Sequence, residues 1–103
     1  PSPQERRALW QSHLGSDHHL STKEINQLAV SSDLAGGHIR NAVLSAAVAA
    51  KDAAQPLRLA HVLLGLRGEY RKLGRQFPAE LSGLDKSTTS LELRLPHDQR
   101  TPA

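Results

Sequence analysis

The chain has 103 residues with no cysteine, 38% hydrophobic but only 3% aromatic residues, and 13 Lys and Arg against 10 Asp and Glu, a formal charge of +3. A chain of this length allows one small domain, and a core with so few aromatic side chains favours packed helices over a β-sandwich. The composition excludes disulfides and cysteine-bound metals, and neither a membrane-spanning run nor a signal-peptide pattern is present, so we expect a cytoplasmic protein without a membrane partner.

Two capping boxes predict where the first two helices begin. Ser2 and Glu5, with a proline between them at the first helical position, mark the first start, and Ser21 and Glu24 mark the second. Gly15 is expected to end the first helix. We therefore expect helices over about 3–14 and 22–32, with Leu9, Trp10, His13, Leu14, Ile25, Leu28 and Ala29 facing the core.

Two adjacent histidines, His18 and His19, lie in the polar connection between these helices. The side chains of neighbouring residues diverge, and no carboxylate or further histidine follows at the i+4 spacing of helical metal-ligand pairs. We therefore expect a solvated loop here and no metal site.

The third predicted helix begins at an unusual pair of glycines. Apolar residues recur at helical spacing over 39–50, which predicts one buried stripe. Gly36 and Gly37 stand just before this stripe, and they would allow a ligand or another chain to approach the first turn closely. A helix N-terminus attracts anions through its free N–H groups, and Arg40 stands at this end. We expect Asp33 to cap the next turn of the chain, which leads into the third helix.

A fourth helix is predicted from about Leu57 to Leu73, after a proline break and before Gly74. Its apolar stripe consists of Leu59, Val62, Leu63, Leu66, Tyr70 and Leu73. Its other face is basic and carries Arg58, Arg67, Arg71, Lys72 and Arg75. The helix dipole favours cations near a C-terminus, so we interpret this face first as a solvated surface.

The chain changes character after residue 75. Residues 76–103 are polar, interrupted by proline and glycine, and without helical periodicity, so we expect a largely flexible tail and a domain boundary at residue 75. The run over 91–95 is an exception, because its alternation of apolar and charged residues is typical of a short strand. Such a strand would need a partner from another domain or a second copy.

Together these features predict an all-α fold, a small four-helix bundle over 1–75 with a flexible C-terminal tail. The third helix opens with Gly36-Gly37-His38-Ile39-Arg40, and the fourth ends with Glu69-Tyr70-Arg71-Lys72-Leu73-Gly74-Arg75. With the order and lengths of the helices, these runs resemble the C-terminal helical lid of AAA+ ATPases. They are also similar to those of a bacterial AAA ATPase of the type encoded beside phage-tail-like contractile particles.

The resemblance implies a nucleotide site at the third helix. In the family this region is called sensor 2, and its arginine reaches the nucleotide phosphates. Here that arginine is Arg40, while His38 stands where many members have an acidic residue. Gly36 and Gly37 would let the helix approach the nucleotide, and His38 would approach its adenine or ribose side. The implied cofactors are ATP and Mg²⁺. The alternative role for Arg40 is a surface ion pair.

The resemblance also implies partners. In the family a larger α/β domain supplies the phosphate-binding loop, the Mg²⁺-holding acid and the water-activating acid. The pattern G-x-x-x-x-G-K-[ST] is absent here, so this chain alone is not expected to hydrolyse ATP. The implied partners are an N-terminal α/β domain of the same polypeptide, neighbouring subunits of a hexameric ring, and a protein substrate. Loss of the γ-phosphate would loosen the lid and rotate it as a rigid body.

Two other classes of function are compatible with the helices. One is a helix-turn-helix nucleic-acid module, with the third helix as reader and the basic fourth helix on phosphates. After Arg40 and Asn41 the third helix offers no polar side chain before Ser45 to read base edges, so we do not expect a nucleic-acid partner. The other class is a helical protein-docking module that binds no nucleotide.

Overall fold

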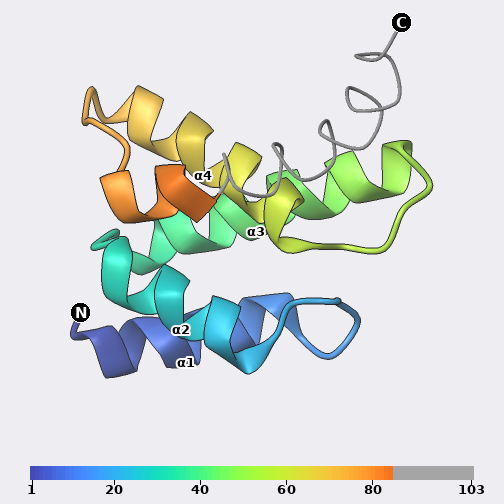
Figure 1. Cartoon of the computed structure of the whole chain (residues 1–103), viewed down its shortest axis with the longest axis horizontal. Helices are drawn as coiled ribbons and strands as arrows, with labels where there is room; N and C mark the ends of the chain where they lie inside the picture. Colours follow the sequence, from blue (N-terminus) through green and yellow to red (C-terminus); the bar gives the residue numbers. More distant parts are fainter. Residues whose placement is uncertain (85–103) are drawn as a thin grey trace, which may run out of the picture.

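The computed structural model describes residues 1–84, which form a bundle of α-helices without a strand in that range (Figure 1). The helices are α1 (Pro3–Leu14), α2 (Thr22–Ser31), α3 (Gly36–Asp52) and α4 (Leu59–Lys72), and a short helical segment follows over 79–84. The predicted all-α bundle is confirmed. No helix in this part of the chain is long and apolar enough to cross a bilayer. The strand predicted over 91–95 lies outside the described residues.

Both predicted capping boxes form, and they fix the starts of α1 and α2. The Ser2 hydroxyl accepts a hydrogen bond from the Glu5 amide at 3.1 Å, and the Glu5 carboxylate accepts one from the Ser2 amide at 2.8 Å. Ser21 and Glu24 form the same pair of bonds at the same two distances. Gly15 ends α1 with a φ of 67°, a left-handed conformation that glycine adopts without a steric penalty.

α3 begins at the predicted pair of glycines, but its cap differs from the prediction. The first helical residue is Gly36 and the N-cap is Ala35, and alanine has no side-chain acceptor for the free amides. Asp33, which was expected to cap this turn, binds Arg75 beyond the end of α4 instead. Asp33 lies two residues before the N-cap Ala35 and therefore does not occupy the capping position, and its carboxylate instead makes a charge-assisted bond with the Arg75 guanidinium.

The bundle consists of two helix pairs that α3 joins. As Figure 1 shows, α1 packs against α2 and α3 packs against α4. α1 also contacts α3. α3 and α4 approach each other closely, since a Cβ atom added at Gly65 would lie 2.5 Å from the carbonyl oxygen of Ala42. Trp10, the single tryptophan of the chain, is fully buried in α1.

The core positions expected from helical spacing are mostly confirmed, with exceptions near helix ends. Leu9 and His13 are only half-buried, and Leu73 is 41% exposed, because it follows the last residue of α4. Arg6 was not expected in the core, yet it is buried and its Nε donates to the Ala29 carbonyl at 2.8 Å. This bond ties α1 to the end of α2. The buried hydrophobic cluster comprises Trp10, Leu14, Leu20, Ile25, Leu28, Ala29, Leu34, Ile39, Ala42, Val43, Ala46, Leu59, Val62, Leu63, Leu66, Tyr70 and Leu81.

The packed bundle extends beyond the boundary expected at residue 75. The rings of Tyr70 and Phe77 meet edge to face with centroids 5.6 Å apart, and the Arg67 guanidinium lies 4.2 Å from the centroid of Phe77. Leu81, in the segment over 79–84, is fully buried. Residues 76–84 therefore complete the core, although so few apolar residues produce no periodic signal in the sequence.

Candidate functional site

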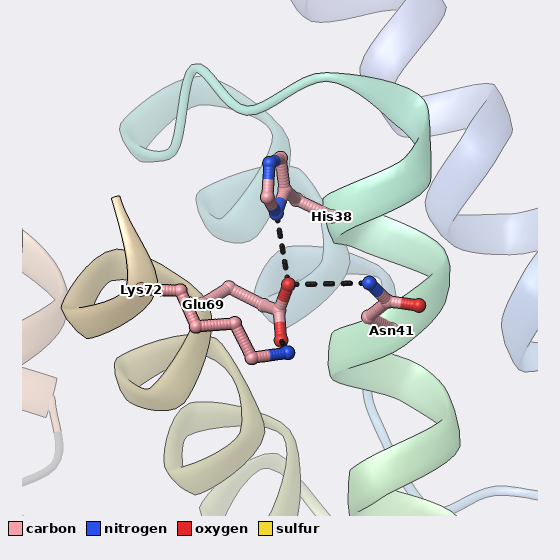
Figure 2. Close-up of polar contacts among 4 residues, drawn as sticks. All are labelled: His38, Asn41, Glu69 and Lys72. Atoms are coloured by element: carbon pink, nitrogen blue, oxygen red, sulfur yellow. Dashed lines mark hydrogen bonds and ion pairs between the residues drawn. The ribbon is translucent and has the colours of Figure 1, made fainter.

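The predicted site residues lie in the first turns of α3, which face the last turns of α4. His38 and Asn41 extend from α3, and Lys72 extends from α4, all toward the carboxylate of Glu69 (Figure 2). These four residues are called the Glu69 cluster below. The cluster therefore joins the start of one helix to the end of the other.

Glu69 is almost completely buried, with 1% of its surface exposed, and both of its carboxylate oxygens are bonded. Oε1 lies 2.8 Å from Nδ1 of His38 and accepts a longer bond from Nδ2 of Asn41 at 3.4 Å. Oε2 accepts a bond from Nζ of Lys72 at 2.7 Å. An ionised carboxylate has no hydrogen to donate, so the imidazole must carry its hydrogen on Nδ1 in this contact. The three donors replace the water that Glu69 loses on burial.

The surroundings of Glu69 favour its ionised form. Burial has the largest single effect and raises the pKa of the carboxyl group, but the hydrogen bonds from Lys72, His38 and Asn41 together outweigh it. The resulting pKa lies below the ordinary value of 4.5. At neutral pH the carboxylate therefore forms an ion pair with Lys72, one turn further along α4.

The four residues predicted to bind nucleotide do not all share one surface. Gly37 and Arg40 are exposed, whereas Gly36 is half-buried beside Leu9. The side chain of His38 is 31% exposed and is turned toward Glu69. Arg40 makes no hydrogen bond or ion pair within residues 1–84, so a surface ion pair for it is not found in this range.

The first turn of α3 suits an anion such as phosphate. Its amides have no side-chain cap, Arg40 adds a full positive charge, and a Cβ atom at Gly37 would meet nothing within 4 Å. Both oxygens of Glu69, the carboxylate that this turn contacts, are already bonded to His38, Asn41 and Lys72, so Glu69 itself is not a free ligand for Mg²⁺.

A second contact holds the loop that leads into α3. Oδ1 of Asp33 accepts a hydrogen bond from Nη2 of Arg75 at 2.5 Å, and this bond lowers the pKa of the Asp33 carboxyl group. The Arg75 guanidinium also lies 5.3 Å from the ring centroid of Tyr70. The segment over 33–41, which contains Gly36, Gly37 and Arg40, is thus attached near both of its ends to the C-terminal end of α4 and the residues that follow.

Sequence reasoning did not identify Glu69, Asn41 or Lys72 as site residues. Glu69 stands three residues after Leu66 and seven after Val62, so helical spacing places a carboxylate on the buried side of α4. That position was an available signal for a bonded buried acid. The partners of Glu69 were not predictable in the same way, because they depend on the register in which α3 crosses α4.

Comparison with known proteins relates this chain to a described family. The family "Contractile injection system ATPase helical domain" matches residues 2–77. The match covers α1 to α4 and reaches Phe77, which packs on Tyr70. It agrees with the resemblance to ATPases of contractile particles that the runs over 36–40 and 69–75 carry. No curated protein and no solved structure was found to match the chain.

Proposed function

Because the chain belongs to the family of contractile injection system ATPase helical domains, we propose that it is the helical lid of a bacterial AAA+ ATPase in such a system. The lid closes over ATP and Mg²⁺, which an N-terminal α/β domain of the same polypeptide holds. By resemblance to AAA+ ATPases, that domain would supply the phosphate-binding loop and the catalytic acids, and the pattern G-x-x-x-x-G-K-[ST] of such a loop does not occur in this sequence. The chain contributes positive charge and closure, and it does not hydrolyse ATP alone.

The observation that carries the nucleotide part of this proposal is the first turn of α3. Arg40 is exposed and makes no bond within residues 1–84, beside amides that no side chain caps. A guanidinium at a helix N-terminus is well suited to a phosphate group, especially where closure excludes water. Arg40 would contact the β- and γ-phosphates, and Gly37 would allow the helix backbone to approach them closely.

Closure of the lid would couple ATP hydrolysis to motion. While the γ-phosphate is present, Arg40 holds the bundle against the α/β domain. After hydrolysis this contact is lost, and the bundle rotates as one body because its helices share one core. In a hexameric ring the rotation would reach the neighbouring subunits and would act on a protein substrate of the injection system.

The test is ATP turnover by the full ATPase carrying Arg40→Ala. Removing one charge-assisted hydrogen bond should lower turnover by roughly 10- to 100-fold. Circular dichroism and the urea midpoint of the chain should not change, because Arg40 is exposed. Arg7→Ala is the matched control, since Arg7 is an exposed arginine on α1.

A second variant tests the close approach of the backbone. Gly37→Ala introduces a methyl group that meets nothing within 4 Å in the bundle, so a rise in the KM for ATP would come from contact with the nucleotide.

Turnover by Arg40→Ala equal to that of Arg7→Ala would remove Arg40 from the nucleotide site.

A further inference from the structure

We propose that Glu69 is a positioning residue, which fixes the direction in which Arg40 leaves the bundle. Its carboxylate does not reach the exposed surface where a nucleotide would lie, so it would act through the α3 backbone. The inference rests on the proposed function of Arg40 for its effect on ATP turnover. Its structural part concerns the first turns of α3 and can be tested without nucleotide.

Two residues that bond to Glu69 lie on either side of Arg40 in the sequence. His38 stands two residues before Arg40, and Asn41 follows it directly, and both side chains bond to the same oxygen, Oε1 of Glu69. With neighbours on both sides held by one buried atom, the backbone at Arg40 cannot rotate about the helix axis. Arg40 itself points away from the cluster, because residues one or two positions apart do not share a helix face.

The start of α3 needs a tertiary contact because its local sequence provides little stabilisation of the first turn. Ala35 gives no side-chain cap, and two consecutive glycines occupy the first helical positions, where they are the residues most costly to order. The starts of α1 and α2 differ, since each has a complete capping box. At α3 a tertiary contact to α4 takes the place of the local cap.

The loop before α3 is held by the same end of α4. Asp33 bonds to Arg75, which follows α4, while Lys72 bonds to the second oxygen of Glu69. Lys72 keeps the carboxylate ionised and aligned, so that Oε1 remains available to His38 and Asn41. Three residues spaced by three, Glu69, Lys72 and Arg75, therefore anchor the whole segment over 33–41.

The structural test compares Glu69→Gln with Asp52→Asn in the chain of 103 residues. Glutamine keeps the size of the side chain but removes its charge, and Asp52 is an exposed acid at the far end of α3. The measurement is hydrogen exchange of the His38 and Ile39 amides, which both donate to the Ala35 carbonyl at 3.0 and 3.2 Å. The Ile25 amide, which makes the equivalent bond in α2 at 3.0 Å, is the internal reference.

In Glu69→Gln we expect the His38 and Ile39 amides to exchange about tenfold faster relative to Ile25, because the bonds that His38 and Asn41 make to this side chain lose its charge, whereas α2 makes no bond to Glu69. Asp52→Asn should leave the ratio unchanged. An unchanged ratio in Glu69→Gln, or an equal acceleration of all three amides, would overturn the positioning role and leave only a general contribution to stability.

The functional test is a double-mutant cycle on ATP turnover by the full ATPase. Glu69→Gln alone should raise the KM for ATP, whereas in the Arg40→Ala background it should have no further effect, since its action passes through Arg40. Independent effects that multiply in the double variant would overturn the inference. Faster exchange at His38 with normal turnover in both single variants would contradict the proposed role of Arg40, while the hold on the α3 turn would stand.

Discussion

Glu69 gives the free energy of unfolding a defined dependence on pH. Its folded-state pKa is below the ordinary value of 4.5, because the hydrogen bonds from Lys72, His38 and Asn41 outweigh the effect of burial. An unfolded chain then binds more protons than the folded one in mildly acidic solution, so stability increases with pH there. The contribution of Glu69 is complete above about pH 4.5 and is lost as the pH falls through its folded-state pKa.

We therefore predict that Glu69→Gln reduces the loss of stability on acidification. At pH 7 the variant should be less stable than the natural sequence by about 1.5–3 kcal/mol, the usual contribution of a hydrogen bond to a charged group. This difference should shrink as the pH is lowered to about 3. The measurement is urea unfolding across this range. Parallel pH profiles for the two proteins would contradict the assignment.

Part of the acid dependence should persist in that variant. The pKa of Asp33 is lowered by its hydrogen bond from Arg75, and the pKa of Glu5 is lowered by its bonds with Ser2. Both groups also favour the folded state above their unfolded pKa values. Both are exposed, so each is expected to contribute less than the buried Glu69.

The packing of α3 against α4 depends on a glycine that sequence periodicity did not single out. Gly65 lies against the backbone of Ala42, and a Cβ atom there would be 2.5 Å from the Ala42 carbonyl oxygen. Backbone cannot yield as a flexible side chain does, so the two helices would have to separate. This would also stretch the Glu69 cluster, which spans the same pair of helices.

Gly65→Ala should therefore destabilise the bundle by about 1–3 kcal/mol, the usual cost of overpacking. Gly68→Ala is the matched control, because it lies on the same helix and its added methyl group would meet nothing within 4 Å. The control should be neutral or more stable by up to about 1 kcal/mol, since alanine is the better helix former. Equal urea midpoints for the two variants would contradict this account of the helix crossing.

Local signals in the sequence predicted the elements well wherever the determining contacts are local. The capping boxes of Ser2 and Ser21 lie within four residues, and both formed as predicted. The cap of α3 was predicted less well, because Asp33 bonds to Arg75, a residue 42 positions away. Helical spacing likewise predicted the buried stripe of α4 but gave no partner for the carboxylate that stands on it.

The whole bundle includes residues that the sequence assigned to the tail. Leu81 is fully buried, and Phe77 packs edge to face on Tyr70, so this stretch closes the core beside α4. It escaped prediction because a short segment with few apolar residues has no measurable periodicity. Only the assembled helices show the space that Leu81 fills.

Leu81→Ala should destabilise the bundle by about 2–5 kcal/mol, the range for deleting a large aliphatic side chain from a core. Leu73→Ala is the matched control, because Leu73 is 41% exposed and lies closer to α4 in sequence. Its substitution should change the free energy of unfolding by about 0.5 kcal/mol or less. Thermal or urea unfolding of both variants provides the measurement, and a neutral Leu81→Ala would place the domain boundary back at residue 75.

The buried Trp10 provides an intrinsic fluorescence probe of unfolding. The chain has one tryptophan and one tyrosine, and they lie in different helix pairs, Trp10 in α1 and Tyr70 in α4. Both rings are buried, so unfolding of either pair changes the emission of its own chromophore. Coincident fluorescence transitions would mean that α3 makes the two pairs melt together. Intrinsic fluorescence therefore reports whether the α1–α2 pair and the α3–α4 pair, which carries the proposed nucleotide contact, unfold cooperatively, without an attached dye.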